Sequence, residues 1–171
     1  MKKIILGLFL VLAALGFYYQ ENNIVKSAPK IGAQLGEKLK EATFTTLEGG
    51  KISLPPKDGK VYVLNLWATW CPPCRSEMPE LQAFYNKYKN DASVGLYLID
   101  YAESPEEINA FFKENNYSMP VVIDNAGASG EMFMTRGIPT TVVLDKDGIV
   151  VFRKVGPVTL QELEDAVNKV K

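Results

Sequence analysis

The sequence predicts an α/β domain with a central mixed β-sheet flanked by helices. Two observations support this prediction. Strand-like and helix-like segments alternate through the middle of the chain, which is typical of β-α-β units with parallel strands. One segment, residues 61–67, is apolar almost throughout, as expected of a central strand covered on both faces. With 171 residues, 47% of them hydrophobic, the chain is long enough for one domain with a substantial core.

The N-terminus has the pattern of an export signal. Lys2 and Lys3 precede an uncharged stretch that ends at residue 19, as secretory signals and signal anchors require. We favour an uncleaved transmembrane signal anchor over residues 1–19, because the tyrosine pair at its end suits the membrane interface. A small-residue site at residues 14–16 keeps a cleaved signal as the alternative. The domain is therefore expected on the extracytoplasmic side of the cell membrane.

A polar stretch over residues 20–34 indicates a tether, and the folded domain is expected over residues 35–171. Its first element is a predicted β-hairpin. Residues 42–47 alternate between apolar and polar side chains, a Glu-Gly-Gly turn follows, and the strand pattern resumes at residues 51–54.

The central strand over residues 61–67 is followed by a predicted helix over residues 75–88 and by a second buried strand over residues 94–99. Apolar residues of the helix recur at spacings of three and four, which places them on one face. They are Met78, Leu81, Phe84, Tyr85 and Tyr88.

The next helix is marked by its capping residues. Ser104 suits the N-cap, a proline follows in the first turn, and Glu107 completes a capping box, so a helix is expected to about residue 115. A short strand over residues 120–123 and a short helix over residues 128–133 follow. The order β-α-β-α implies that the central strands are parallel.

The C-terminal part is predicted to be a hairpin and a helix. Residues 140–144 and 149–152 have strand patterns around a Lys-Asp-Gly turn, which favours antiparallel pairing. Thr159 and Glu162 form a second capping box, and the apolar residues that follow give the last helix one buried face.

The charge of the chain argues against a nucleic-acid partner. The formal net charge is −1 and the isoelectric point is about 5.6. No long run of Lys or Arg is present that could neutralise a row of phosphates.

The two cysteines, Cys71 and Cys74, are poorly placed for a structural role. A bridge between them closes a loop of only four residues, which is worth about 2 kcal/mol against almost 5 kcal/mol for a 100-residue loop. A closed zinc site needs two further ligands, and the chain has no histidine and no third cysteine. We therefore expect no metal and no cofactor other than a redox-active Cys71–Cys74 disulfide.

A redox role suits their position between a strand and a helix. The strand delivers Cys71 to the first helical turn, where unpaired N–H groups and the helix dipole stabilise a thiolate. Cys74 is one turn further on, within reach to resolve a mixed disulfide. Pro72 and Pro73 fit the first turn, where a missing N–H costs little. We predict Cys71 as the attacking thiol and Cys74 as the resolving thiol.

These motifs together resemble the thioredoxin superfamily. Trp70 and the Cys-Pro-Pro-Cys motif follow a buried strand, and Gly-Ile-Pro-Thr-Thr at residues 137–141 precedes the next strand. The stretch around the cysteines, the hairpin, the anchor and the helix-strand insertion at residues 106–124 resemble the TlpA/ResA/DsbE-like branch in particular. The resemblance covers residue 35 to the end. Asn65 stands where plain thioredoxin has a buried Asp, so the strand acid is missing.

The resemblance implies roles for three further residues. The Ile138–Pro139 bond would be cis, on a loop that faces the cysteines and presents the backbone of residue 138 to an extended client. Glu77 would lie near the cysteine pair, where a carboxyl with a raised pKa could exchange protons with the thiols.

The resemblance also implies a thiol-disulfide oxidoreductase tethered outside the cytoplasm. Its clients would be disulfides of apocytochrome c or of other exported proteins, and a transmembrane donor of the CcdA/DsbD kind would supply electrons. An oxidase or isomerase-like role in the same compartment is the main alternative. An anchored, non-catalytic binding domain is a further one. A peroxiredoxin is disfavoured because Ala68 occupies its threonine position, and a copper-delivery module because histidine is absent.

Overall fold

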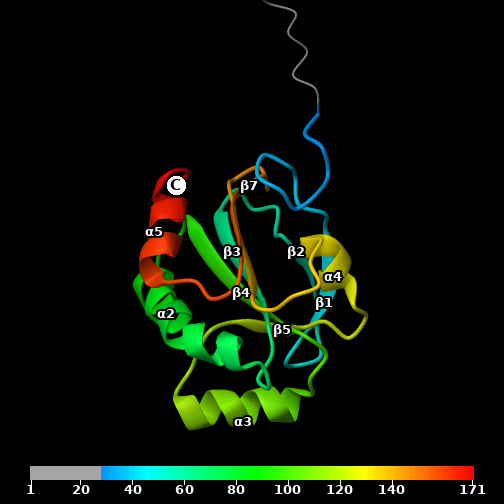
Figure 1. The fold of residues 1–171 in the computed structure, drawn as a ribbon, viewed down its shortest axis with the longest axis vertical. Helices are drawn as coiled ribbons and strands as arrows, with labels where there is room; N and C mark the ends of the chain where they lie inside the picture. The colour runs from blue at the N-terminus through cyan, green and yellow to red at the C-terminus, as the bar shows by residue number, and fades with distance from the viewer. Residues whose placement is uncertain (1–27) are drawn as a thin grey trace, which may run out of the picture.

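The α/β prediction is confirmed by a computed structural model, which describes residues 28–171 (Figure 1). These residues form one seven-stranded sheet with the strand order β2-β1-β5-β4-β3-β6-β7. The strands are β1 (Ala42–Thr46), β2 (Lys51–Leu54), β3 (Val61–Trp67), β4 (Val94–Asp100), β5 (Val121–Ile123), β6 (Thr140–Leu144) and β7 (Val150–Val155). Each predicted element forms, with ends that differ by at most three residues from those expected.

The strand directions make the sheet mixed. Strands β3, β4 and β5 run parallel, as the β-α-β pattern predicts. Strand β6 pairs antiparallel with β3, and β7 pairs antiparallel with β6. The N-terminal hairpin of β1 and β2 joins the sheet through β5, so the inserted strand connects the hairpin to the central strands.

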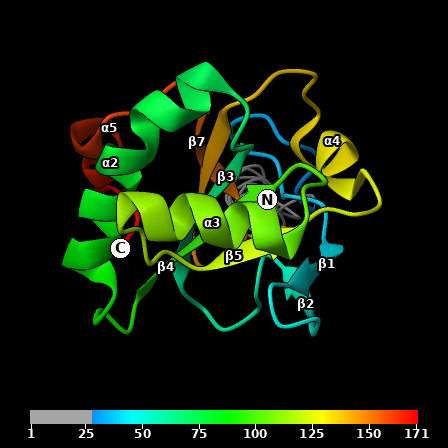
Figure 2. The same cartoon turned by 90° about the horizontal axis from the view of Figure 1, so that it is seen from below.

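Helices cover both faces and one end of the sheet (Figures 1 and 2). They are α2 (Pro72–Tyr88), α3 (Pro105–Asn115), α4 (Ala128–Phe133) and α5 (Leu160–Asn168). Helices α2 and α5 pack together on one face, α4 lies on the other, and α3 crosses the end of the sheet near the last residues of β3 and β4. Both predicted capping boxes are present, at the starts of α3 and α5.

The apolar character of β3 follows from its central position. All seven of its side chains are buried. Val61 and Val63 pack into the core under α2 and α5, whereas Tyr62 and Leu64 pack into the core under α4. Alternate side chains of a strand point to opposite faces, so a strand covered on both faces needs apolar residues at nearly every position. Asn65 is the polar exception.

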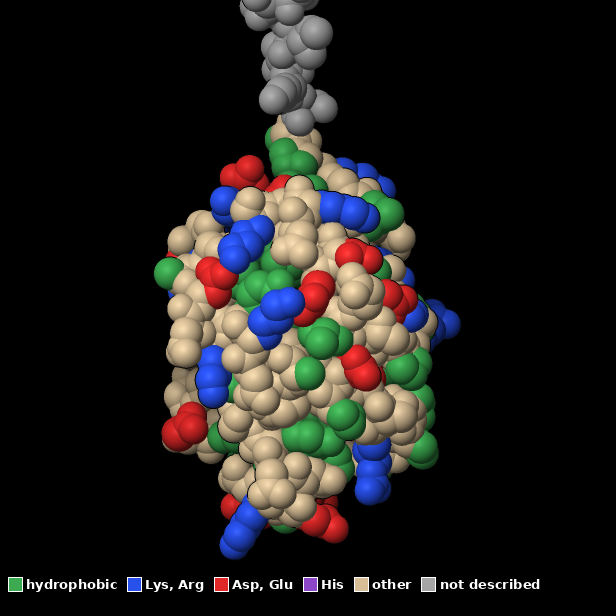
Figure 3. Space-filling model, turned by 90° about the vertical axis from the view of Figure 1, so that its left-hand side faces the viewer, with side chains coloured by type: hydrophobic (Ala, Val, Ile, Leu, Met, Phe, Trp, Pro, Cys, Tyr) green, Lys and Arg blue, Asp and Glu red, His purple; other side chains and the backbone are tan. Residues whose placement is uncertain are grey.

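The outer face of α2 and α5 carries charges of both signs. Figure 3 shows Lys and Arg side chains interspersed with Asp and Glu on this side of the molecule. Lys87 of α2 and Glu164 of α5 form an ion pair at 2.6 Å that links the two helices. Exposed pairs of this kind contribute about 0–1 kcal/mol, so the helices are held mainly by the apolar residues beneath them.

The chain already packs on the domain before residue 35. The backbone N–H of Gly32 donates to the Lys38 carbonyl at 2.9 Å, and Ala33 is fully buried. The last residues of the expected tether are therefore part of the packed structure.

The expected anchor over residues 1–19 and the tether residues 20–27 lie outside the described residues. None of the helices within residues 28–171 has the length and apolar character needed to cross a membrane.

Candidate active site

Cys71 and Cys74 lie at the start of α2 and are joined by a disulfide. Strand β3 ends at Trp67, and a short turn brings Cys71 to the N-cap of the helix. The Cys74 backbone N–H donates a hydrogen bond to Cys71 Sγ at 3.3 Å. This sulfur therefore lies at the positive end of the helix dipole, a position that stabilises a thiolate once the disulfide is reduced.

Pro72 and Pro73 occupy the first two positions of α2. Neither residue has a backbone N–H, so Cys74 supplies the first helical amide that can point at the Cys71 sulfur. Both proline rings face solvent. The two prolines therefore begin the helix without placing a backbone N–H of their own next to the Cys71 sulfur.

The two cysteines differ slightly in exposure, and both are buried in the oxidised chain. Cys71 is 3% exposed and Cys74 is 0% exposed. Cys71 is thus the cysteine of the pair that has accessible surface. The predicted attacking thiol needs such access to reach a client. Trp70, the residue before it, is 61% exposed.

The loop that carries Ile138 and Pro139 faces the cysteines. The Ile138 carbonyl oxygen lies 3.9 Å from Cys71 Sγ. The Ile138–Pro139 peptide bond is cis, as the family resemblance predicts. Pro139 is buried, whereas Ile138 is half-buried. The structure therefore brings two distant segments of the sequence together around one sulfur.

A cleft of about 320 Å³ is lined by Trp70, the residue before Cys71, and by Ile138. Its remaining lining residues are Leu66, Tyr101, Gly130, Thr135, Arg136 and Gly137. A mainly apolar cleft with backbone groups at its rim suits an extended peptide. The larger cleft near Pro55 and Lys146, about 510 Å³, contains none of the predicted site residues.

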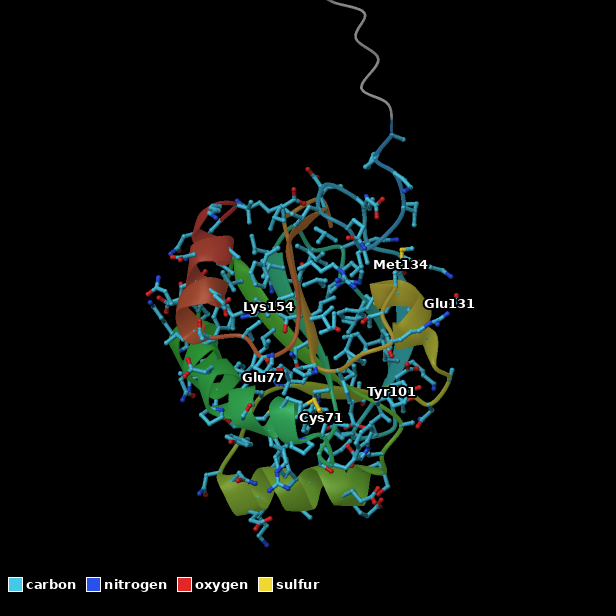
Figure 4. The ribbon with its side chains drawn as sticks, viewed as in Figure 1. Cys71, Glu77, Tyr101, Glu131, Met134 and Lys154 are labelled. Carbon is cyan, nitrogen blue, oxygen red and sulfur yellow. A yellow bond between two sulfur atoms is a disulfide. The ribbon has the colours of Figure 1, made fainter. Side chains whose placement is uncertain are left out.

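Glu77 lies one turn after Cys74 and is only 1% exposed. Its Oε1 accepts a hydrogen bond from Asn65 Nδ2 at 2.8 Å, and its Oε2 accepts one from the Val158 backbone N–H at 2.7 Å. Burial raises the pKa of the carboxyl to about 7, although both hydrogen bonds and the charge of Lys154 oppose the rise. Figure 4 shows Glu77 on α2, between the labelled Cys71 and Lys154. Such a carboxyl can take up or release a proton at neutral pH.

Asn65 connects Glu77 to the neighbouring strand. Its Nδ2 also donates to Thr141 Oγ1 at 2.9 Å, while its buried Oδ1 has no hydrogen-bond partner. The side chain fills the place of the strand acid of plain thioredoxin with a neutral amide. The buried carboxyl with a raised pKa therefore lies on helix α2, one turn from Cys74, and the strand contributes a neutral amide.

Two carboxyl groups beside the turn before Cys71 are not among the predicted site residues. Glu103 binds Thr69, and Asp100 lies behind Glu103. The register of the parallel strands pairs Trp67 with Asp100. In the sequence, the one signal for them is that Asp100 directly follows a predicted parallel strand, since functional residues of α/β sheets gather at the carboxyl ends of such strands.

The fold and the site together define the class of protein. A disulfide-bonded cysteine pair at the start of a helix, a cis-proline loop opposite it and a mixed sheet with helices on both faces are the features of a thioredoxin-like thiol-disulfide oxidoreductase. The family model for Redoxin matches residues 34–170. The chain belongs to the Redoxin family.

Known relatives agree with this assignment. The chain is 35% identical over 143 residues to the thiol-disulfide oxidoreductase ResA of Bacillus cereus, covering 84% of this chain and 82% of that protein. It is 31% identical over 169 residues to the thioredoxin-like protein YneN of Bacillus subtilis, covering 98% of each. The crystal structure of StoA from Bacillus subtilis is similar with a TM-score of 0.65 and 32% identity, covering 74% of this chain and 96% of that one. The protein is therefore a thiol-disulfide oxidoreductase of the ResA/StoA type, and its partners are thiols and disulfides.

Proposed function

We propose that this enzyme reduces disulfides in apocytochrome c or in other exported proteins, on the extracytoplasmic side of the cell membrane. The observation that carries the proposal is the placement of the Cys71 sulfur at the start of α2, next to the Trp70 and Ile138 residues that line the cleft, with Glu77 buried one turn further along the helix. The export pattern of the N-terminus supports the compartment. The likeness to ResA and the TlpA/ResA/DsbE-like pattern support the client class.

Reduction of a client begins at Cys71. Its thiolate attacks one sulfur of the client disulfide, an S–S bond joins enzyme and client, and the second client sulfur leaves as a thiolate that takes up a proton. The helix dipole and the Cys74 N–H are placed to stabilise negative charge on the Cys71 sulfur, which favours the attacking thiolate.

Release of the client requires Cys74. Its thiol gives a proton to the Glu77 carboxylate, and the sulfur attacks Cys71 Sγ and closes the enzyme disulfide, while the first client sulfur leaves as a thiolate. Glu77 then releases that proton, and the leaving client thiolate is protonated. The client has gained two electrons from the cysteine pair and two protons, of which one is equivalent to the proton lost by Cys74 and the other comes from solvent. Glu77 suits this step because it lies one turn from Cys74 and titrates near neutral pH.

The cleft offers a place for the client chain. The exposed Trp70 ring and the half-buried Ile138 flank Cys71, and the Ile138 carbonyl is next to the sulfur. A client segment that runs along this loop could pair with the backbone of residue 138 while its apolar side chains contact Trp70. The pairing would align the client disulfide with the Cys71 sulfur.

The cycle needs a reductant, for which we propose a transmembrane dithiol donor of the CcdA/DsbD kind. Such a donor would supply two electrons and two protons to the Cys71–Cys74 disulfide. If the donor is absent, the protein should accumulate in the oxidised form, which trapping of free thiols in intact cells would show.

The reduction potential of the Cys71–Cys74 couple tests the direction of the reaction. Equilibration with glutathione should give a value nearer to the thioredoxin value of about −270 mV than to the DsbA value of about −120 mV. A value near the DsbA end would instead assign the oxidase role. Replacing Cys71 with Ser in cells should lower the yield of c-type cytochromes. An unchanged yield would remove apocytochrome c from the clients.

The location has its own test. Protease added to intact cells should release an active fragment by cutting ahead of the packed residues near Gly32. If the protease leaves both the enzyme and a cytoplasmic marker protein uncut, the domain lies inside the cell. That result would overturn the choice of clients.

A further inference from the structure

Glu103 holds the turn that precedes the attacking cysteine. Its Oε2 accepts a hydrogen bond from the Thr69 backbone N–H at 2.6 Å, and its Oε1 accepts one from the Thr69 hydroxyl. Thr69 is two residues before Cys71, in the short connection between β3 and α2. Both oxygens of one carboxylate are thus used on one residue of the active-site turn.

Asp100 supports Glu103 from the end of β4. Its Oδ1 accepts a hydrogen bond from the Glu103 backbone N–H at 2.9 Å. Asp100 is 0% exposed, and its Oδ2 is buried without a hydrogen-bond partner. Between the two acids the chain turns sharply at Ala102, which adopts a left-handed φ of 65°. A residue with a side chain adopts that conformation only at a cost in free energy, so the contacts on either side must hold the bend.

The surroundings of the two carboxyl groups are acidic. Glu107 of α3 is the other acid that acts on Asp100, and Asp124 at the end of β5 directs its carboxylate to the amides that begin α4. Within residues 28–171, no lysine or arginine forms an ion pair with Asp100 or Glu103. Burial, then the interaction with the Glu103 side chain and repulsion from Glu103 and Glu107, raises the pKa of Asp100 to about 8, although the hydrogen bond from the Glu103 backbone N–H opposes the rise.

We propose that Glu103 is a positioning residue for the thiol-disulfide exchange, and that protonated Asp100 keeps it in place. With its proton, Asp100 can donate from its unpartnered oxygen toward the Glu103 carboxylate, which in turn fixes Thr69 and the Trp70–Cys71 segment. Without that proton, two adjacent carboxylates repel each other, and Glu103 is pushed away from Thr69. The orientation of the Cys71 sulfur therefore depends on a proton that is not itself transferred in the reaction.

This inference rests on the exchange chemistry of Cys71 and not on the client or on the direction of electron flow. Its pH dependence has a definite sign. Positioning is complete while Asp100 is protonated and weakens as the pH rises through about 8. The rate constant per Cys71 thiolate should therefore fall across that range, although the thiolate fraction itself increases.

The experiment measures exchange of the reduced, full-length chain with a small aromatic disulfide by stopped flow from pH 6 to pH 9.5. The thiolate fraction is measured separately by its ultraviolet absorbance. The variants are Glu103→Ala, which removes both bonds to Thr69, and Asp100→Asn, which keeps a donor and an acceptor but cannot ionise. Glu106→Ala is the matched control, because Glu106 is an exposed acid three residues further along, in the first turn of α3, and its side chain has no hydrogen bond or ion pair among the described residues.

We expect Glu103→Ala to lower the rate constant per thiolate at pH 7 by about tenfold, as loss of alignment does in general. Asp100→Asn should stay within about twofold of the parent chain at pH 7 and should lose the decline above pH 8. Equal rates for Glu103→Ala and Glu106→Ala, or an unchanged pH profile in Asp100→Asn, would overturn the inference. If Glu103→Ala does not fold, the Asp100→Asn profile decides alone. A parent chain that does not react at all would instead refute the exchange chemistry.

Discussion

The side chains of Asn65 and Glu77 meet inside the core, where Asn65 Nδ2 donates to Glu77 Oε1 at 2.8 Å. An amide can serve both protonation states of a neighbouring carboxyl. It donates to the carboxylate, and after a half-turn its Oδ1, which has no other partner, can accept from the protonated acid. An Asp at position 65 would place a second charge beside Glu77. The amide therefore allows Glu77 to titrate alone.

Replacing Glu77 with Gln should flatten the pH dependence of stability of the oxidised chain. The folded-state pKa is raised from 4.5 to about 7, mainly by burial. The unfolded chain therefore loses this proton first, and stability falls as the pH rises from about 4.5 through about 7. The loss is on the order of 3 kcal/mol. Denaturant unfolding at pH 5 and pH 8 should show it in the parent chain and not in Glu77→Gln.

Glu80→Gln is the control for this comparison. Glu80 lies on the same helix, is partly exposed and accepts the Leu160 backbone N–H at 2.8 Å. This variant should keep the slope of the parent chain. A slope that persists in Glu77→Gln would show that another group causes the pH dependence.

Replacing Asn65 with Leu should destabilise the fold more at pH 8 than at pH 5. The change removes the donor to Glu77 Oε1 and to Thr141 Oγ1 while leaving an apolar side chain of similar size. At pH 8 the Glu77 carboxylate would lose one of its two hydrogen bonds inside the core, at a cost of about 2–3 kcal/mol. Urea titrations at the two pH values measure this difference. Equal losses at both would separate the role of Asn65 from the charge of Glu77.

Most of the fold was predictable because the local signals agree with the tertiary structure. Strand β3 forms where the apolar run predicts it, and helices α3 and α5 begin at the capping boxes of Ser104 and Thr159. The glycine turns likewise lie between strands that form. What local patterns could not show is the pairing of β1 with β5, which joins segments almost 80 residues apart through only two register pairs. The packing of Ala33 was hidden for the same reason, since a polar segment can still bury one small residue.

The residues of the predicted site also differ in whether the sequence reveals that they lie close together. Cys71, Cys74 and Glu77 share one helix, so their spacing in the sequence gives their proximity. The neighbourhood of Ile138 could be expected only from the family resemblance, because nothing local to residue 138 points to Cys71. Asp100 and its partner Glu103 have ordinary sequence surroundings, and their proximity to the site depends on the register of β3 with β4.

Replacing Trp70 with Ala should weaken the binding of a protein client without changing the intrinsic exchange chemistry. Trp70 is 61% exposed at the cleft, so its removal should change the free energy of unfolding by less than about 0.5 kcal/mol. Loss of an aromatic contact of 1–2 kcal/mol raises KM about fivefold to thirtyfold. Steady-state reduction of a disulfide-bonded protein measures KM, and a small disulfide reagent measures the intrinsic rate.

Leu35→Ala provides the control for the Trp70 variant, since Leu35 is 67% exposed and does not line the cleft. It should leave both kinetic constants unchanged. If Trp70→Ala slows the small reagent as much as the protein client, the indole acts on the cysteines and not on the client.

Replacing Cys74 with Ser should trap clients as mixed disulfides on Cys71. Cys71 is the cysteine with accessible surface, and its sulfur accepts a hydrogen bond from the first free backbone N–H of α2. The Ile138 carbonyl, at the edge of the cleft, lies beside this sulfur. Without Cys74 no intramolecular thiol can resolve the complex, so a covalent adduct with a disulfide-bonded peptide should persist until a reductant is added. Cys71→Ser, which leaves only the fully buried Cys74, should form the adduct at least about tenfold more slowly. Non-reducing electrophoresis, with mass spectrometry of the linked peptides, measures adduct formation by the two variants. Equal adduct formation by both would mean that this geometry does not fix which cysteine attacks and which resolves.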